Sequence, residues 1–475
     1  MIGIYLAIAF IISILLFFNR NKTINYTLVI CFVVLQCGFT LYEYLHINIP
    51  ELYYFTPDAL ALLMLITLTI ISIAAMYHSF KYLSGKNDIP KHTAIYFSAM
   101  VVLLTAISAA YLSNHIAVTW IFVEITTLSA SALIYHRRNS RSLEGTWKYV
   151  FVCAISLTLV FVGILFLSFA LKQAGSDDLS YDILLTKAPE LNLFWLQLAF
   201  IFIFTGFTAK LGLVPMYTAG IDAKDKAPSP AGALFSSVLI NMGFVAIFRF
   251  YIIISHTTLH SWANHVIIIA AILSIFVATV YMTKVKNIKR MLAYSSVEHS
   301  GLVMLGLAAG GVGYYAAILH IILHSFAKSS IFFQMGQIYR TYKSKSIYDV
   351  GNYFKYNLTG AMVMLLAFFI ITAMPPSGLF ISEFMIFRSL FEANYLPLLI
   401  IVMVLLTMII WAFGKNIFKL IFSPVVDFNE ANMEKINPAE SFSQFIFLGL
   451  VIYLGLNPPA EFVTLIRESI KNLPH

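Results

Sequence analysis

The feature that most constrains this chain is the recurrence of apolar runs of about 20 residues, a length that crosses a hydrocarbon core of roughly 30 Å. A helix satisfies its own backbone hydrogen bonds, which lipid requires. Of the 475 residues, 60% are hydrophobic and only 11% are charged, too few polar residues to cover a soluble domain. We therefore predict an all-α polytopic membrane protein with about fourteen transmembrane helices. The predicted spans are 2–18, 25–45, 56–80, 93–112, 115–135, 149–171, 192–220, 231–254, 264–283, 291–310, 312–338, 358–390, 396–422 and 441–457.

Basic residues are concentrated in alternate connections between these runs, which predicts the orientation of the chain. Arg137, Arg138 and Arg141 follow the fifth run, for example, whereas the next connection is acidic. By the positive-inside rule, odd-numbered helices end in the cytoplasm, so both termini are predicted to lie outside it, in a cell (inner) membrane. The net charge of +8 is thereby explained by topology, and nucleic-acid binding is not expected. The first run lacks a basic segment and a cleavage site, so it is predicted to be a retained helix.

No motif for a cofactor is present in the sequence. Cys31, Cys37 and Cys153 lie in apolar runs without metal-ligand spacing, and no glycine-rich nucleotide loop follows a strand. We predict no cofactor, no metal site and no redox chemistry in this chain.

Several ionisable residues lie deep inside the apolar runs, where each costs roughly 2.5–3.5 kcal/mol to insert. Such residues usually face a partner or a water-filled cavity. Three of them follow one another at spacings of four in the eleventh helix and therefore share one helical face. The set of candidate proton-translocating residues is Glu124, Lys210, His320, His324, Lys328 and Glu383.

Each of these residues also has a purely structural interpretation. Lys210 and Lys328 can extend to an interface, Glu124 can bind a structural partner, and a single buried histidine is usually a packing residue. Three titratable groups in register favour a relay instead. Asp58 and Glu298 lie nearer to helix starts, and we expect them only to cap.

Prolines interrupt two of the charged runs. Pro215 follows Lys210 by five residues, and Pro375 and Pro376 shortly precede Glu383. A break of this kind is tolerated in lipid only where the backbone is buried or lines a cavity, so we predict a polar cavity at Lys210. Helices 7 and 12 are five helices apart, which predicts two inverted five-helix repeats. The expected parts of a single transmembrane domain over 1–475 are helices 1–3 at about 1–90, the first repeat (helices 4–8) at 91–255, the second repeat (helices 9–13) at 260–422, and the last helix and tail at 440–475.

At these residues the chain resembles the antiporter-like membrane subunits of respiratory complex I, and most closely the component F type of hydrogenase-4 and formate hydrogenlyase. The resemblance covers roughly residues 55 to 420. The phrases that carry it are "VEITTLSASALIYHRRNSRSLEGTWKY" (123–149), "GFTAKLGLVPMYTAGIDAKDKAPSPAGALFS" (206–236), "KNIKRMLAYSSVEHSGLVMLG" (286–306), "HSFAKSSIFFQMGQIY" (324–339) and "PPSGLFISEFMIF" (375–387).

The resemblance implies a fourteen-helix proton-translocating subunit. A fifth-helix glutamate pairs with a seventh-helix lysine in that family, and a hydrophilic axis leads to a twelfth-helix lysine or glutamate. These roles fall on Glu124, Lys210 and Glu383, with the eleventh-helix residues between them. The chain departs from the family pattern at Asn241, where a central lysine or histidine is usual, and at Ile221 and Lys224, which replace a proline and a histidine. Further relay candidates are Asn241, Lys224, Glu298 and His299.

Three functions remain open from the sequence. The leading hypothesis is a proton-translocating, cofactor-free subunit of a redox-driven complex, with other membrane and redox subunits as partners. The second is a subunit of an Mrp-type cation/proton antiporter, which would move protons or Na⁺. The third is a membrane partner in inorganic-carbon uptake. The chain's Asp222-Ala223 and its "SSVEH" phrase favour the hydrogenase type over Mrp.

Overall fold

A computed structural model describes residues 1–83, 89–424 and 433–474 of the chain. The described residues are helical apart from turns, irregular connections and isolated bridges, and each of the predicted apolar runs contains helical residues. Eleven helices in this part of the chain are long and apolar enough to cross a membrane, and two apolar helices, Ile2–Phe18 and Leu358–Ile371, are shorter. The all-helical prediction is therefore confirmed.

The helices form two compact units. The first comprises Met1–Ala227, Val238–Val266 and Thr464–His475, and the second comprises Pro228–Ser237 and Ile267–Val463. The first unit contains α1 (Ile2–Phe18), α2 (Lys22–Leu45), α3 (Ala59–Tyr82), α4 (Pro90–Leu112), α5 (Ile116–Ile134), η1 (Tyr135–Arg137), α6 (Ser140–Gln173), α7 (Tyr181–Lys187), η2 (Ala188–Glu190), α8 (Leu193–Leu211), α9 (Thr218–Lys226), α11 (Val238–Ser255) and the start of α12 (His260–Lys284).

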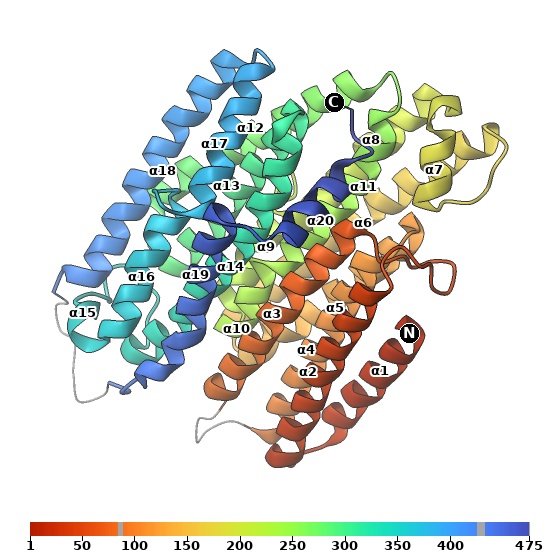
Figure 1. Ribbon diagram of the computed structural model, residues 1–475. Coiled ribbons are helices and arrows are strands. Elements are labelled where there is room, and N and C mark those ends of the chain that lie inside the picture. Colours follow the sequence, from red (N-terminus) through yellow and green to blue (C-terminus); the bar gives the residue numbers. More distant parts are fainter. Residues whose placement is uncertain (84–88, 425–432, 475) are drawn as a thin grey trace. The chain divides into compact units, whose positions relative to one another are not determined.

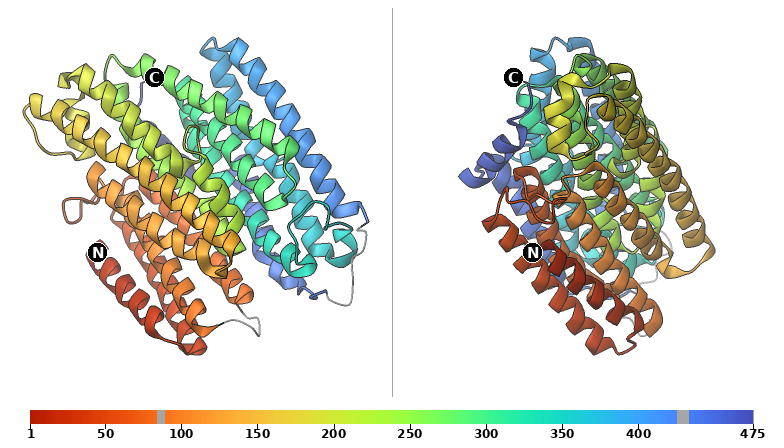
Figure 2. Two further views of the ribbon diagram at one scale, coloured as in Figure 1. Left: turned by 180° about the vertical axis from the view of Figure 1, so that it is seen from behind. Right: turned by 90° about the vertical axis from the view of Figure 1, so that its right-hand side faces the viewer.

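Close helix packing organises the first unit. Helices α1 to α4 lie side by side, and α6 runs along α8 (Figures 1 and 2). Two glycines allow the α6–α8 approach, because a Cβ on Gly163 would lie 2.9 Å from Ile203 N and one on Gly206 would lie 3.0 Å from Val160 N. Small residues at such contacts are a common means of association between helices in lipid.

Asp58 caps α3, as the sequence predicts. Its Oδ1 accepts a hydrogen bond from Ala61 N at 2.7 Å, and its Oδ2 pairs with Arg249 Nη2 at 2.7 Å. Arg249 lies in α11 and also donates to the Ser113 carbonyl oxygen. The carboxylate therefore joins the start of α3 to α11.

The second unit is built around α14, a helix whose membrane-crossing window is buried along its entire length. Helices α10, α13, α16, α17 and α19 pack against it (Figure 1), which explains how a helix with two histidines and a lysine avoids lipid. The unit contains α10 (Ser229–Phe235), most of α12, α13 (Ile288–Ala309), α14 (Val312–Tyr342), α15 (Tyr353–Tyr356), α16 (Leu358–Ile371), α17 (Gly378–Glu392), α18 (Leu396–Phe422), η4 (Pro438–Ser441), α19 (Phe442–Leu456) and the start of α20 (Ala460–Ile470).

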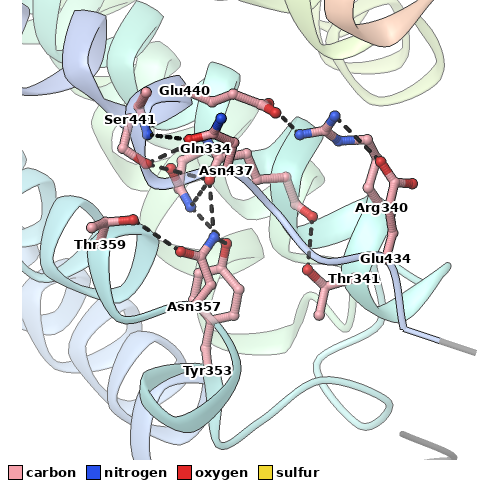
Figure 3. Close-up of polar contacts among 12 residues, drawn as sticks. Gln334, Arg340, Thr341, Tyr353, Asn357, Thr359, Glu434, Asn437, Glu440 and Ser441 are labelled. Carbon is pink, nitrogen blue, oxygen red and sulfur yellow. Dashed lines mark hydrogen bonds and ion pairs between the residues drawn. The ribbon is translucent and has the colours of Figure 1, made fainter. Parts of the chain in front are cut away.

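A polar network fixes the C-terminal part of α14 (Figure 3). Gln334 Nε2 donates to Tyr353 Oη at 2.7 Å, and Asn357 Nδ2 donates to the same oxygen at 2.9 Å. Arg340 pairs with Glu440 in η4. These bonds join α14 to α15, to the start of α16 and to η4, and they hold the helix that carries the titratable residues.

Both predicted helix breaks are present. Helix α8 ends at Leu211, where Gly212 adopts a left-handed conformation with φ +79°, and α9 begins only at Thr218. A glycine in this position is a common helix end. Helix α16 ends at Ile371 and α17 begins at Gly378, with Pro375 and Pro376 between them. The inverted relation between the two repeats stays a prediction.

Candidate titratable clusters

Lys210 lies in the last turn of α8, and its side chain is buried in the first unit with a relative exposure of 4%. Its Nζ donates to Thr127 Oγ1 at 2.7 Å and to Tyr149 Oη at 3.2 Å. The same atom lies 5.4 Å from the centroid of the Tyr149 ring. Two hydroxyls and an aromatic ring therefore surround the ammonium group, and among the described residues no carboxylate forms an ion pair with it.

Glu124 lies on α5, one turn before Thr127, and is partly exposed. Among the described residues, no ion pair within 4.0 Å joins Glu124 to Lys210, and the lysine contacts α5 through Thr127 instead. The two candidates thus lie on two helices of one unit, which the Lys210–Thr127 hydrogen bond joins.

Gly243 on α11 allows the end of α8 to approach closely. A Cβ at this position would lie 2.8 Å from the Lys210 carbonyl carbon and 3.0 Å from Leu211 Cα. Both atoms belong to the backbone, so the clash cannot be relieved by a rotamer change. The position of the Lys210 backbone therefore depends on this glycine.

We expect Gly243→Ala to destabilise the protein by about 1–3 kcal/mol, the usual cost of overpacking. The measurement is the thermal unfolding midpoint in detergent. Gly38→Ala is the matched control, because a Cβ on that helical glycine meets nothing within 4 Å. An unchanged midpoint in Gly243→Ala would contradict the close approach.

The two further candidates of the first unit are also buried. Lys224 lies in the short helix α9, next to Asp225, whose Oδ2 pairs with Lys226 Nζ at 2.8 Å. Asn241 lies in α11 and is fully buried. Neither residue contacts Lys210 through a hydrogen bond in the described part of the chain.

In the second unit, the structure brings His320 to His299 of α13. His299 Nδ1 lies 3.0 Å from His320 Nε2, and His320 Nδ1 lies 2.9 Å from Ser382 Oγ on α17. The His324 ring packs on His299 with centroids 5.0 Å apart. His320 and His324 therefore share one face of α14, as predicted. The hydrogen bonds of His320, however, are made to His299 on α13 and to Ser382 on α17.

The Ser382 hydroxyl indicates which atoms donate and which accept in the hydrogen-bonded series from His299 through His320 to Ser382. Its hydroxyl donates to the Leu379 carbonyl oxygen at 3.0 Å, so its oxygen accepts from His320 Nδ1–H. In the tautomer in which His320 Nδ1 carries the hydrogen, a neutral His320 accepts at Nε2 from His299 Nδ1–H, and His299 Nε2 is then the unprotonated nitrogen. No hydrogen bond within the described residues reaches that nitrogen.

Glu298 does not cap a helix, contrary to the expectation from the sequence. Helix α13 begins at Ile288 and Asn287 caps it, which places Glu298 in the middle of the helix. Its Oε2 lies 3.6 Å from His299 Nε2. Glu298 thus stands beside the free lone pair of the imidazole pair.

Glu383 and Lys328 complete the cluster. A carboxylate oxygen of Glu383 lies within 4.8 Å of a ring nitrogen of both His299 and His320. Lys328 Nζ donates to Ser295 Oγ at 2.8 Å and to the Leu292 carbonyl oxygen at 3.2 Å. One buried cluster of acids, imidazoles and an ammonium group therefore joins α13, α14 and α17.

Comparisons with known proteins agree with the motifs. The family described as "NADH:quinone oxidoreductase/Mrp antiporter, TM" matches residues 113–409. The "Hydrogenase-4 component F homolog" of Methylacidiphilum infernorum (isolate V4) is 28% identical over 376 residues, which cover 78% of this chain and 78% of the relative.

Two solved structures share the fold. A chain of the membrane-bound sulfane sulfur reductase (MBS), an archaeal respiratory membrane complex, superposes with a TM-score of 0.88 at 19% identity, covering 99% of this chain and 97% of its own. A chain of the Mrp complex from Dietzia sp. DQ12-45-1b gives 0.87 at 13% identity, covering 99% and 96%. The chain therefore belongs to the NADH:quinone oxidoreductase/Mrp antiporter family of transmembrane proteins, and it is a multi-pass, antiporter-like membrane subunit.

Proposed function

We propose that the chain is a proton-translocating subunit of a redox-driven membrane complex of the hydrogenase-4 or complex I type. In this proposal the protons move through Glu124, Lys210, the eleventh-helix residues His320, His324 and Lys328, and Glu383. The electron-transfer chemistry belongs to partner subunits. From the distribution of basic residues, we propose that both termini lie outside the cytoplasm.

The observation that supports this most is the hydrogen-bonded chain from His299 through His320 to Ser382, flanked by Glu298 and Glu383. A proton on Glu298 can pass to the basic Nε2 of His299. The resulting imidazolium can release its Nδ1 proton to His320 Nε2, and His320 can in turn release its Nδ1 proton to the Glu383 carboxylate, an oxygen of which lies within 4.8 Å of a His320 ring nitrogen. Each imidazole takes up a proton on one nitrogen and gives one up from the other, which no amide or hydroxyl achieves alone at neutral pH.

Lys210 supplies the switch in the first unit. A buried ammonium group without a counterion is costly, so its protonation responds to any charge that approaches. Glu124 is such a charge, on the element that already contacts Lys210 through Thr127. We infer that Glu124 draws Lys210 into the charged form when it moves close, and that the lysine releases its proton when Glu124 withdraws.

The direct test is to purify the complex from its native membrane through a tag on this chain and to identify the co-purifying chains. Iron–sulfur or nickel subunits support the proposal. Small antiporter subunits without redox partners would instead identify an Mrp-type complex, and a soluble carbonic-anhydrase-like chain would identify a role in inorganic-carbon uptake.

A further inference from the structure

Three lysines gather around two exposed aromatic rings at one end of the second unit, where α15 packs against α18 (Figure 1). Lys286 Nζ lies 5.9 Å from the centroid of the Tyr348 ring, and Lys419 Nζ lies 4.9 Å from the same centroid. One turn before Lys419 on α18, Lys415 Nζ lies 5.3 Å from the centroid of the Trp411 ring. We call these five residues the lysine–aromatic cluster.

Backbone hydrogen bonds fix the position of the Tyr348 ring. Ile347 N donates to the Lys286 carbonyl oxygen at 2.9 Å, and Ile288 N donates to the Lys345 carbonyl oxygen at 3.0 Å. The Ile347 side chain is buried. These contacts hold the segment that carries Tyr348 against the connection between α12 and α13. The fold itself therefore places Tyr348 beside Lys286.

The cluster carries positive charge that no carboxylate neutralises. Among the described residues, none of its three lysines forms an ion pair; their contacts are those with the two rings. The neighbouring carboxylate, Asp349, accepts a hydrogen bond from Ser344 Oγ at 2.7 Å. An ammonium group on the face of a ring still has N–H donors to give to another ligand. The ligand that fits such a cluster is an anion.

The position of the cluster along α18 indicates which anion it meets. The 27 residues of this helix extend about 40 Å, roughly 10 Å more than the hydrocarbon core of a bilayer. Its last turns hold Lys415 and Lys419. Large apolar side chains are exposed along the turns before them, namely those of Ile400, Ile401, Met403, Val404 and Met408. The exposed surface of α18 thus changes from apolar to basic, as a phospholipid changes from acyl chain to phosphate.

We propose that the lysine–aromatic cluster binds the headgroup of an anionic phospholipid, whose acyl chains lie along the exposed apolar surface of α18. Lysine is a common ligand of phosphate groups, and basic clusters next to the membrane attract anionic lipids. Trp and Tyr rings are typical of the level at which headgroups meet acyl chains. None of the five residues belongs to the proposed proton path, so this inference goes beyond the proposed function and does not rest on it.

The test uses the fluorescence of Trp411. The full chain is reconstituted into phosphatidylcholine vesicles with a minor fraction of phosphatidylglycerol, and the acyl chains of one lipid or the other carry bromine, which quenches tryptophan on contact. The difference between the wild type and Trp411→Phe isolates the signal of this residue from those of the other tryptophans. We expect brominated phosphatidylglycerol to quench Trp411 several-fold more than its share of the lipid predicts.

Substitution of the lysines should remove this preference. Lys415→Gln and Lys419→Gln should each lower it by up to about fivefold, the effect of one lysine near anionic headgroups. High salt should lower it in the wild type without any substitution, because the cluster is exposed and its charges are screened. Lys471→Gln, which changes an exposed lysine paired with Glu468 at 2.9 Å, is the matched control and should keep the preference.

Two results in vesicles would overturn the proposal: quenching of wild-type Trp411 in proportion to the lipid composition, or an unchanged preference when both Lys415 and Lys419 are replaced. The same measurement on the purified complex tests for a different occupant. If neither brominated lipid quenches Trp411 there, a partner subunit covers the cluster, and the lipid assignment is wrong.

Discussion

Replacing Lys210 with methionine is expected to stop proton translocation while leaving the chain folded and assembled. Methionine fills a similar apolar volume, and the change leaves only the Thr127 and Tyr149 hydroxyls without a donor. Thr127 already bonds to the Val123 carbonyl oxygen at 3.3 Å, so we expect a stability cost of about 1 kcal/mol. The lost function follows because no other group at this position can carry the proton.

The measurement is proton uptake by vesicles that contain the complex, reported by a pH-sensitive dye while the redox reaction runs. Lys187→Met is the control, since Lys187 ends the short helix α7 and pairs with Glu190 at 2.7 Å. Normal flux in Lys210→Met would show that Lys210 is a structural residue.

The second large effect is expected from His320→Gln. A glutamine side chain can hold hydrogen bonds to His299 and Ser382, so the packing of α14 should be retained. An amide cannot accept a proton on one atom and release one from another at neutral pH, so the chain of proton transfers is interrupted. We expect flux to fall to the background of empty vesicles.

The Ser382→Ala variant distinguishes proton transfer by His320 from the positioning of its ring by the Ser382 hydroxyl. The Ser382 hydroxyl only fixes the orientation of the His320 ring, so its loss should lower flux a few-fold without abolishing it. His265→Gln, an exposed histidine on α12, should behave as the wild type. If His320→Gln pumps normally while Ser382→Ala does not, the histidine pair does not carry the proton.

Much of the fold follows from the sequence, because length and hydrophobicity decide whether a segment crosses lipid. The apolar runs, the breaks after Lys210 and before Glu383, and the cap at Asp58 were each predictable from local rules. The short helices α7, α9, α15 and α20 were not predicted, since they lack the length and apolar character that mark a span.

The partners of the charged residues were less predictable. Thr127 and Tyr149 lie far from Lys210 in the chain, and only the rotation of α5 and α6 about their axes brings them to it. The face of α14 was predicted from its spacing of four, but the contact from His320 to His299 depends on how α13 packs against α14. Glu298 was misjudged as a cap, because α13 begins at Ile288 and Asn287 caps it, which leaves Glu298 in the middle of the helix.

In the proposed function, buried titratable side chains of this subunit carry protons across the membrane. The most direct measurement is the number of protons moved per redox turnover in vesicles containing the complex with Glu383→Gln, compared with Glu392→Gln. We expect Glu383→Gln to assemble but to move no protons through this subunit, so that the ratio falls, whereas Glu392→Gln, which changes an exposed carboxylate paired with Arg388, should keep the wild-type ratio. An unchanged ratio in a fully assembled Glu383→Gln complex would contradict it.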